Sequence, residues 1–260
     1  NYCCLGGGVK IAQILFLFSF ISAQWSSESA YLLEKNRKEV GIFTPFKMGM
    51  NNGSELSVNK FLLMPSLSLK QEMSMYKSWK MARKFKVEYP TPGLKWLQSP
   101  LGGEMGDPNM FSLISTQFTI PHMFSFFTEF IGTKGSVKSG QLSLSAGAGI
   151  ALNTKDLSND ATIDLPIIYP RLSVYYDDFV IVSGAEYLRQ ISNRFYYLID
   201  YDMYLMPGSA GRYAFEQQSF LVWHKSSRIN LSFGYKLIVG EYPYGGQAHL
   251  LPNINLKFGW

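Results

Sequence analysis

The stretch QLSLSAGAGIALN, residues 141–153, decides the fold class because its apolar residues recur at every second position. Leucine, alanine and isoleucine occupy the even positions, and the positions between them hold mostly glutamine, serine, glycine and asparagine. Such alternation predicts a β-strand with one apolar and one polar face. Residues 194–205 and 228–239 alternate in the same way, so the sequence predicts three long strands.

Weaker alternation extends the prediction to most of the chain. The further predicted strands are 38–48, 57–70, 79–89, 112–120, 123–132, 169–177, 179–189, 213–225 and 247–260. The total is about twelve strands, and ten remain possible. Many of these strands exceed the five or six residues usual in soluble sheets, and they match the 9 to 11 tilted residues that cross a bilayer. The sequence therefore predicts an all-β protein, a closed antiparallel transmembrane β-barrel with a polar lumen.

Composition agrees with a sheet protein and excludes other classes. The chain has 260 residues, of which 47% are hydrophobic, 15% aromatic and 17% charged. Soluble domains average about 25% charged residues, which is more than in this chain. Disordered chains contain fewer apolar residues than this chain does. The net charge of +5 is spread along the chain, so no basic patch points to a nucleic-acid partner.

The first 23 residues read as a leader and signal peptide. Lys10 precedes the apolar run 11–21, and Ser22 and Ala23 form a small-residue cleavage site. A transmembrane helix is the alternative, but it needs about 20 apolar residues, and the chain becomes polar from Gln24. Residues 24–260 would then form a single barrel domain without cysteine, and no later apolar run is long enough for a spanning helix.

Connection lengths provide an independent test, because outer-membrane barrels alternate short periplasmic turns with longer outside loops. Most of the predicted connections follow this rule, but 153–164 and the tight 177–178 break it. The region 89–111 contains four prolines, which no central strand could carry. We expect it to be an outside lid or a plug folded into the lumen, or else a surface loop with no partner.

The polar face of the strands would line a watery lumen. On strand 79–89, for example, lysines alternate with Met81, Phe85 and Val87. The candidate lumen-lining residues are Lys80, Lys84, Lys86, Glu129, Glu186, Asp200, Asp202, Lys236, His249 and Lys257. Basic residues slightly outnumber acidic ones on the inward face as a whole, which predicts a mild preference for anions.

The chain ends in an alternating strand whose last apolar-face residues are aromatic, Phe258 and Trp260. With the signal segment and the strand pattern, this ending resembles that of bacterial outer-membrane β-barrel proteins of porin-like architecture. The resemblance implies that Phe258 and Trp260 act as an assembly signal for the barrel-assembly machinery. It also implies a place in the outer membrane of a Gram-negative-type bacterium, with the lipid bilayer as partner, and pairing of the last strand with the first.

Function is predicted at the level of class. A passive channel or transporter for small solutes fits the predicted lumen best. The alternatives are a structural or assembly subunit of an envelope complex and, less favoured, a barrel lipid hydrolase. No nucleophile motif surrounds any serine, and His122, His224 and His249 have no metal-ligand spacing. We therefore expect no catalytic residue, no metal and no cofactor.

Overall fold

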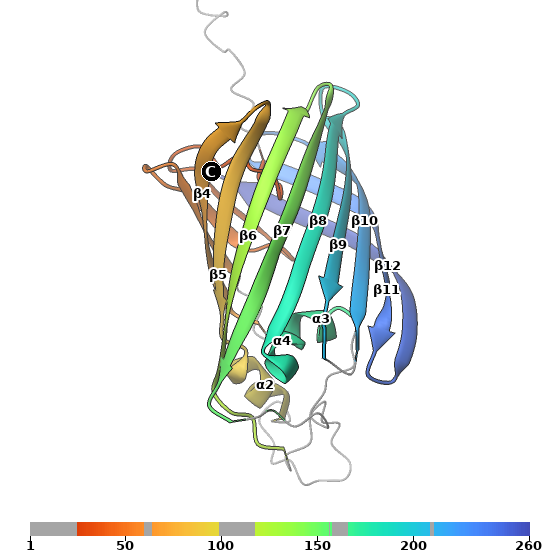
Figure 1. The fold of residues 1–260 in the computed structure, drawn as a ribbon. Coiled ribbons are helices and arrows are strands. Elements are labelled where there is room, and N and C mark those ends of the chain that lie inside the picture. The colour runs from red at the N-terminus through yellow and green to blue at the C-terminus, as the bar shows by residue number, and fades with distance from the viewer. Residues whose placement is uncertain (1–24, 60–63, 99–117, 156, 158–165, 209–210) are drawn as a thin grey trace, which may run out of the picture.

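The computed structural model describes residues 25–260 except 60–63, 99–117, 156, 158–165 and 209–210, and it is a closed antiparallel barrel of twelve strands (Figure 1). The strands are β1 (Lys38–Gly41), β2 (Phe46–Gly49), β3 (Ser54–Asn59), β4 (Ser66–Tyr76), β5 (Trp79–Glu88), β6 (Met123–Ser136), β7 (Gly140–Asn153), β8 (Phe179–Gln190), β9 (Phe195–Leu205), β10 (Tyr213–His224), β11 (Ile229–Tyr242) and β12 (Gly245–Gly259). Each strand pairs with its neighbours in sequence, and β12 closes onto β1 through Glu39 opposite Gly259. The predicted fold class is confirmed.

The predicted strand boundaries need four corrections. Residues 38–48 form two strands, because Pro45 lacks a backbone N–H and the chain turns back at 42–45. Residues 57–70 are shared between β3 and β4, which the segment ending in Pro65 separates. Of the predicted strand 112–120, residues 112–117 lie outside the described part, and 118–120 are not in a strand. The predicted leader and signal peptide also lies outside the described residues.

The fourth correction concerns 169–177, which forms the helices α3 (Tyr169–Leu172) and α4 (Val174–Asp177). Pro170 suits the first turn of a helix, where its missing N–H is not needed. Tyr169, Leu172 and Tyr175 recur at intervals of three and are all buried, so the helical period explains their burial better than a pleat does. No described helix is long and apolar enough to cross a membrane.

Long connections gather at one end of the barrel (Figure 1). Residues 89–122 join β5 to β6 and include α2 (Thr91–Gln98), and 154–178 join β7 to β8 and include α3 and α4. The opposite end has short turns such as 77–78 and 137–139. The two exceptions to the loop-length rule, 153–164 and 177–178, disappear. Residues 154–178 form one long connection, and it lies at the same end of the barrel as the other long connections.

The two faces of the wall differ in polarity, as the alternation predicts. Leu144 is 45% exposed and Phe233 43% exposed on the outer face. Large apolar side chains are also exposed on the other long strands, among them Phe85, Phe126, Phe130, Ile150, Ile181, Tyr197, Tyr201, Leu221, Tyr235 and Ile254. A soluble monomer rarely exposes so extensive an apolar surface. Inside, Ser143, Glu186 and Lys236 are buried among polar neighbours.

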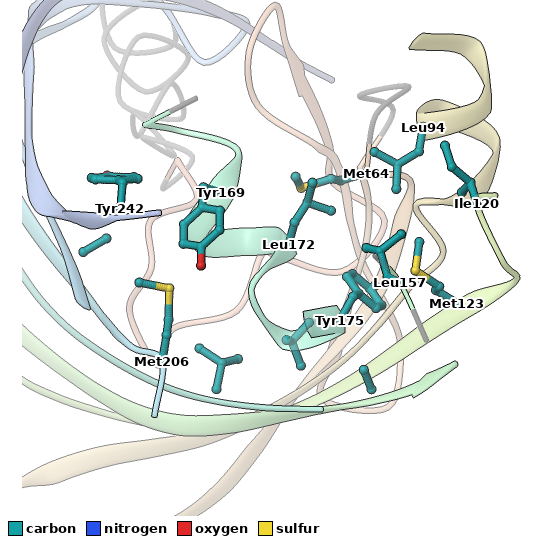
Figure 2. Close-up of a cluster of buried hydrophobic side chains, with 14 of the residues drawn as sticks. Met64, Leu94, Ile120, Met123, Leu157, Tyr169, Leu172, Tyr175, Met206 and Tyr242 are labelled. Atoms are coloured by element: carbon teal, nitrogen blue, oxygen red, sulfur yellow. The ribbon is translucent and has the colours of Figure 1, made fainter. Parts of the chain in front are cut away.

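A compact apolar cluster fills the long-loop end of the barrel (Figure 2). Leu172 and Tyr175 lie on the lumen helices α3 and α4, and Leu94 of α2 packs into the same cluster. Met206 and Tyr242 join it from the ends of β9 and β11. The barrel therefore has an apolar core at one end and a polar interior between that core and the other end.

Candidate functional site

A polar cavity of about 430 Å³ occupies the middle of the lumen. Residues of β2 to β10 line its wall. Glu28 borders it from the chain segment before β1, and Pro170 and Arg171 of α3 border it from the other end. The cavity therefore lies between an N-terminal segment and the lumen helices, and these two segments bound it along the barrel axis.

The N-terminal segment is residues 25–35, which we call the strap. Its backbone donates hydrogen bonds to side chains on widely separated parts of the wall. Ala30 N donates to Thr133 Oγ1 of β6 at 2.8 Å, and Leu33 N donates to Glu55 Oε2 of β3 at 3.0 Å. The Ser26 carbonyl accepts from Lys257 Nζ of β12 at 3.3 Å. Because β12 is six strands away from β6 in the twelve-strand barrel, the strap lies across the lumen.

Lysines from the wall hold the strap by its carbonyl groups and by Glu28. Lys70 Nζ donates to the Tyr31 carbonyl at 2.9 Å. Glu28 forms ion pairs with Lys84 at 3.1 Å and with Lys47 at 3.3 Å. These two ammonium groups, Lys47 more than Lys84, hold the pKa of Glu28 well below its ordinary range. The carboxylate therefore stays ionised, and the strap is fixed by polar contacts.

Sequence reasoning missed the strap. Residues 25–37 precede the first alternating run and carry no strand pattern, so the sequence predicts no role for them. A usable signal was present: Trp25, Ala30 and Leu33 are apolar residues scattered in a polar segment, and each is buried in the structure. A segment of this kind beside a predicted wide lumen can fold into the barrel and bury its apolar residues there.

At the other end, polar contacts anchor the lumen helices to the wall. Arg171 Nη2 donates to Glu216 Oε2 of β10 at 2.9 Å, and Lys236 also pairs with this carboxylate. Tyr175 Oη lies 2.7 Å from Ser125 Oγ. Burial, and then the nearby carboxylate of Glu88, raises the pKa of Tyr175, so its hydroxyl stays protonated. These contacts tie α3 and α4 to β6, β10 and β11.

The structure places the candidate lumen residues as follows. Those that line the cavity are Lys84, Lys86, Glu129, Glu186, Asp200 and Asp202. Lys257 lines a second cavity of about 190 Å³ beside Trp25. Lys80 pairs with Glu72 at 3.0 Å, and Lys236 belongs to the Glu216 group. His249 Nε2 lies 3.0 Å from Gln247 Oε1.

The charge balance of the cavity differs from the expected cationic bias. Its lining has five basic residues (Lys47, Lys70, Lys84, Lys86 and Arg171) and seven acidic ones (Glu28, Glu55, Glu88, Glu129, Glu186, Asp200 and Asp202). Each of the basic residues is in an ion pair. Asp200 accepts a hydrogen bond from Gln218 at 3.1 Å, and in the described part of the chain Glu186 Oε1 is buried without a hydrogen-bond partner. The difference arises because several bases of the inward face, among them Lys80, Lys236 and Lys257, do not line this cavity.

The predicted lid region is only partly described. Its residues 91–98 form α2, whose Leu94 and Leu97 are buried in the apolar cluster. Residues 99–117 lie outside the described part. Thr91 Oγ1 donates to the Pro121 carbonyl at 3.0 Å and so ties the start of α2 to the start of β6. The described part of this region packs at the long-loop end of the barrel.

The histidines and the C-terminal aromatics do not line the 430 Å³ cavity, although His224 lines the second one. His122 Nδ1 lies 2.6 Å from Tyr89 Oη, and His224 packs against the rings of Trp25 and Tyr196. These contacts involve no serine. Phe258 is opposite Val40 in the β1–β12 pair.

Trp260 continues that pairing beyond the last strand residue. Its backbone exchanges hydrogen bonds of 2.9 and 3.0 Å with Lys38, and its ring centroid is 6.5 Å from that of Phe46. The last strand thus pairs with the first, as the resemblance implied, and the two C-terminal aromatics flank the closing seam.

Comparison with known proteins gives a likeness of fold. No family model matches the sequence, and no curated protein matches it significantly. Among solved structures, a NanC porin in a rhombohedral crystal form matches with a TM-score of 0.50 and 10% sequence identity. The match covers 85% of this chain and 97% of the porin chain. The resemblance to porin-like outer-membrane barrels is therefore confirmed at the level of the fold.

Proposed function

We propose that this protein is an outer-membrane channel for small solutes and that the strap holds it closed. The observation that carries the proposal is the nature of the strap's contacts. Glu28 and the backbone of Ala30 and Tyr31 meet lysine, threonine and other polar groups of the wall. Water can replace such contacts at small net cost. Opening must also expose the buried Trp25, Ala30 and Leu33 of the strap and move α3 and α4 out of the apolar cluster at the other end of the barrel. A polar lumen with a releasable obstruction suits a gated channel.

The outer surface supports a membrane location. Exposed apolar side chains on the long strands, such as Phe126, Ile181 and Leu221, would face hydrocarbon. Strands of ten or more residues are long enough to cross a bilayer when tilted. The short turns would lie on the periplasmic side, where the strap enters, and the long connections with α2, α3 and α4 would lie outside.

The lining favours small cations. The basic residues around the cavity are neutralised by carboxylates, and Glu186, Asp200 and Asp202 give the β8–β9 wall an acidic character. Acidic side chains in a pore attract cations within a Debye length of about 8 to 10 Å. We therefore infer that the channel prefers cations, in place of the anion preference that the sequence predicts.

A reversible cross-link between strap and wall tests the gate. Ala30→Cys and Thr133→Cys place two cysteines where the strap backbone meets β6, and the chain after residue 24 has no other cysteine. We expect single-channel openings in planar bilayers to cease on oxidation and to return on reduction. The Ala30→Cys single variant is the control and should be unaffected by oxidant. Equal conductance of the oxidised and reduced double variant would refute the gate, and absence of any conductance after reduction would refute the channel.

A further inference from the structure

The wall of the barrel is incomplete beside β12. β1 and β2 have four residues each, against the 9 to 11 needed to cross a bilayer. β12 pairs with β11 from Gly245 to Phe258 but with β1 only from Lys257 to Gly259. Within the described residues, the remainder of β12 therefore has no strand on its second side.

Backbone geometry shows which groups of β12 are left unpaired. Gly259 N donates to Arg228 of the chain leading into β11, and Trp260 N donates to Lys38 at the start of β1. Because antiparallel strands alternate their hydrogen-bonding sides, even-numbered residues of β12 point their N–H and C=O groups toward β1. Leu256 O does so and accepts from Ile42 N at 3.1 Å. From 246 to 254 the even positions direct these groups at the unpaired side.

Pro252 occupies one of these even positions. Proline has no N–H to donate, so it is tolerated in a strand where that side has no partner, and it discourages another strand from adding there. The sequence of β12 is thus suited to a free edge. An unpaired backbone is costly in hydrocarbon unless it lines a cavity that supplies polar groups. The free edge of β12 therefore calls for a polar occupant.

Polarity changes sharply across this gap. On the outside, Ile42 is 58% exposed and Phe43 is 77% exposed, and Leu250 and Ile254 of β12 are also exposed. Phe43 lines both lumen cavities, which places it where the gap meets the interior. The gap thus has an apolar rim on its outer side.

The interior behind the rim combines apolar side chains, such as Leu198, Phe220 and Val222, with uncharged hydrogen-bonding groups. In the second cavity the hydrogen-bonding groups include Gln218, Asn230, Ser232, Asn253 and Asn255. Asn230 is 4% exposed, and its Oδ1 has no hydrogen-bond partner in the described structure. The ammonium group there, Lys257, already donates to the Ser26 carbonyl at 3.3 Å. A buried acceptor without a donor points to a ligand hydroxyl or amide.

We propose that this gap is a lateral opening that admits an amphiphile with one hydrocarbon chain and an uncharged, hydroxyl-bearing headgroup from the bilayer into the second cavity. The headgroup would bind the amide side chains and the unpaired backbone groups at the free edge of β12, and the hydrocarbon chain would lie against the apolar rim formed by Phe43, Leu250 and Ile254. The strap and the lumen helices bound the lumen axially, so a sideways route also suits the resting state. The proposal rests on the membrane location proposed above, but it needs no conductance.

Photo-crosslinking in nanodiscs tests the opening. The probe is monolauroyl glycerol with a diazirine in its acyl chain, and mass spectrometry locates the labelled residues. We expect labelling concentrated at Phe43 and residues 248–254, and Asn253→Leu should reduce it about tenfold. Asn51→Leu, the same change in the exposed β2–β3 turn, is the matched control. Heat-modifiable gel migration verifies that both variants are folded.

Three results would overturn the proposal. Labelling spread evenly around the outer belt would mean that no opening exists. Equal labelling by diazirine-bearing laurate would contradict selection of an uncharged headgroup. Cross-links between two copies along β12 would show that the edge pairs with another strand. Labelling without conductance would reject only the channel, and strap-dependent conductance without labelling would reject only the opening.

Discussion

Glu28→Gln should favour the open channel by weakening the strap's attachment to the wall. The substitution keeps the shape of the side chain and removes the charge that faces Lys84 at 3.1 Å and Lys47 at 3.3 Å. Lys84 keeps a second carboxylate, Glu129, at 3.2 Å, so the wall on that side remains neutralised. The substitution therefore weakens mainly the attachment of the strap to the wall.

The size of the effect follows from the exposure of the pair. The Glu28 side chain is 53% exposed to the lumen, so each ion pair is expected to contribute about 0.2 to 1 kcal/mol, as exposed pairs do. Both together contribute about 1 kcal/mol. Since about 1.4 kcal/mol corresponds to a factor of ten, the ratio of open to closed channels should rise about fivefold.

The assay is the open probability of single channels in planar bilayers near pH 7. Glu34→Gln makes the same change of charge on the exposed end of the same strap and should leave the open probability unchanged. If Glu28→Gln and Glu34→Gln behave alike, the ion pairs of Glu28 do not hold the strap. If both resemble the wild type, the strap does not govern opening through this residue.

The same carboxylate predicts the pH dependence. The pKa of Glu28 is lowered when the strap is bound, mainly by Lys47 and then by Lys84. A lowered pKa means that the stabilisation is fully present above the free carboxyl pKa of about 4.3 and is lost as pH falls below it toward the bound-state value. Wild-type channels should therefore open more often in that acidic window. Glu28→Gln should remove this dependence, and an unchanged acid response in the variant would assign it to another group.

Three further predictions address the wall, the selectivity and the C-terminus. Leu144→Arg on the outer face should cost about 2 to 4 kcal/mol of unfolding free energy in lipid, and Ser145→Arg on the inner face should cost less; equal costs, measured by urea titration, would mean that the two faces are wrongly assigned. Asp200→Asn should move the reversal potential in a salt gradient away from cation selectivity, and no movement would place the selective charges elsewhere. Deleting Trp260 should lower the amount of folded barrel in cells far more than the stability of barrel refolded in detergent, and unchanged cellular amounts would refute an assembly role.

The sequence by itself determined the features that depend on a period-two pleat. Residues 141–153 form β7 within the predicted register, with Leu144 outside and Ser143 buried inside. The same parity places Lys84, Glu129 and Asp200 around one cavity. Alternation depends on the environment that each face of a strand meets. It can therefore be recognised in the sequence without knowing which strands pair with one another.

Only the tertiary structure decided how the lumen is filled. The strap carries no periodic pattern, because its contacts are made by backbone groups and by Glu28 with strands that are distant in sequence. The sequence predicts a strand where α3 and α4 lie, because in a segment of nine residues the periods of two and 3.6 are hard to distinguish. The charge balance depended on these same segments and on ion pairs between strands. The free edge of β12 arises because β1 ends at Gly41, and strand pairing across the closing seam is a long-range contact that local patterning does not encode.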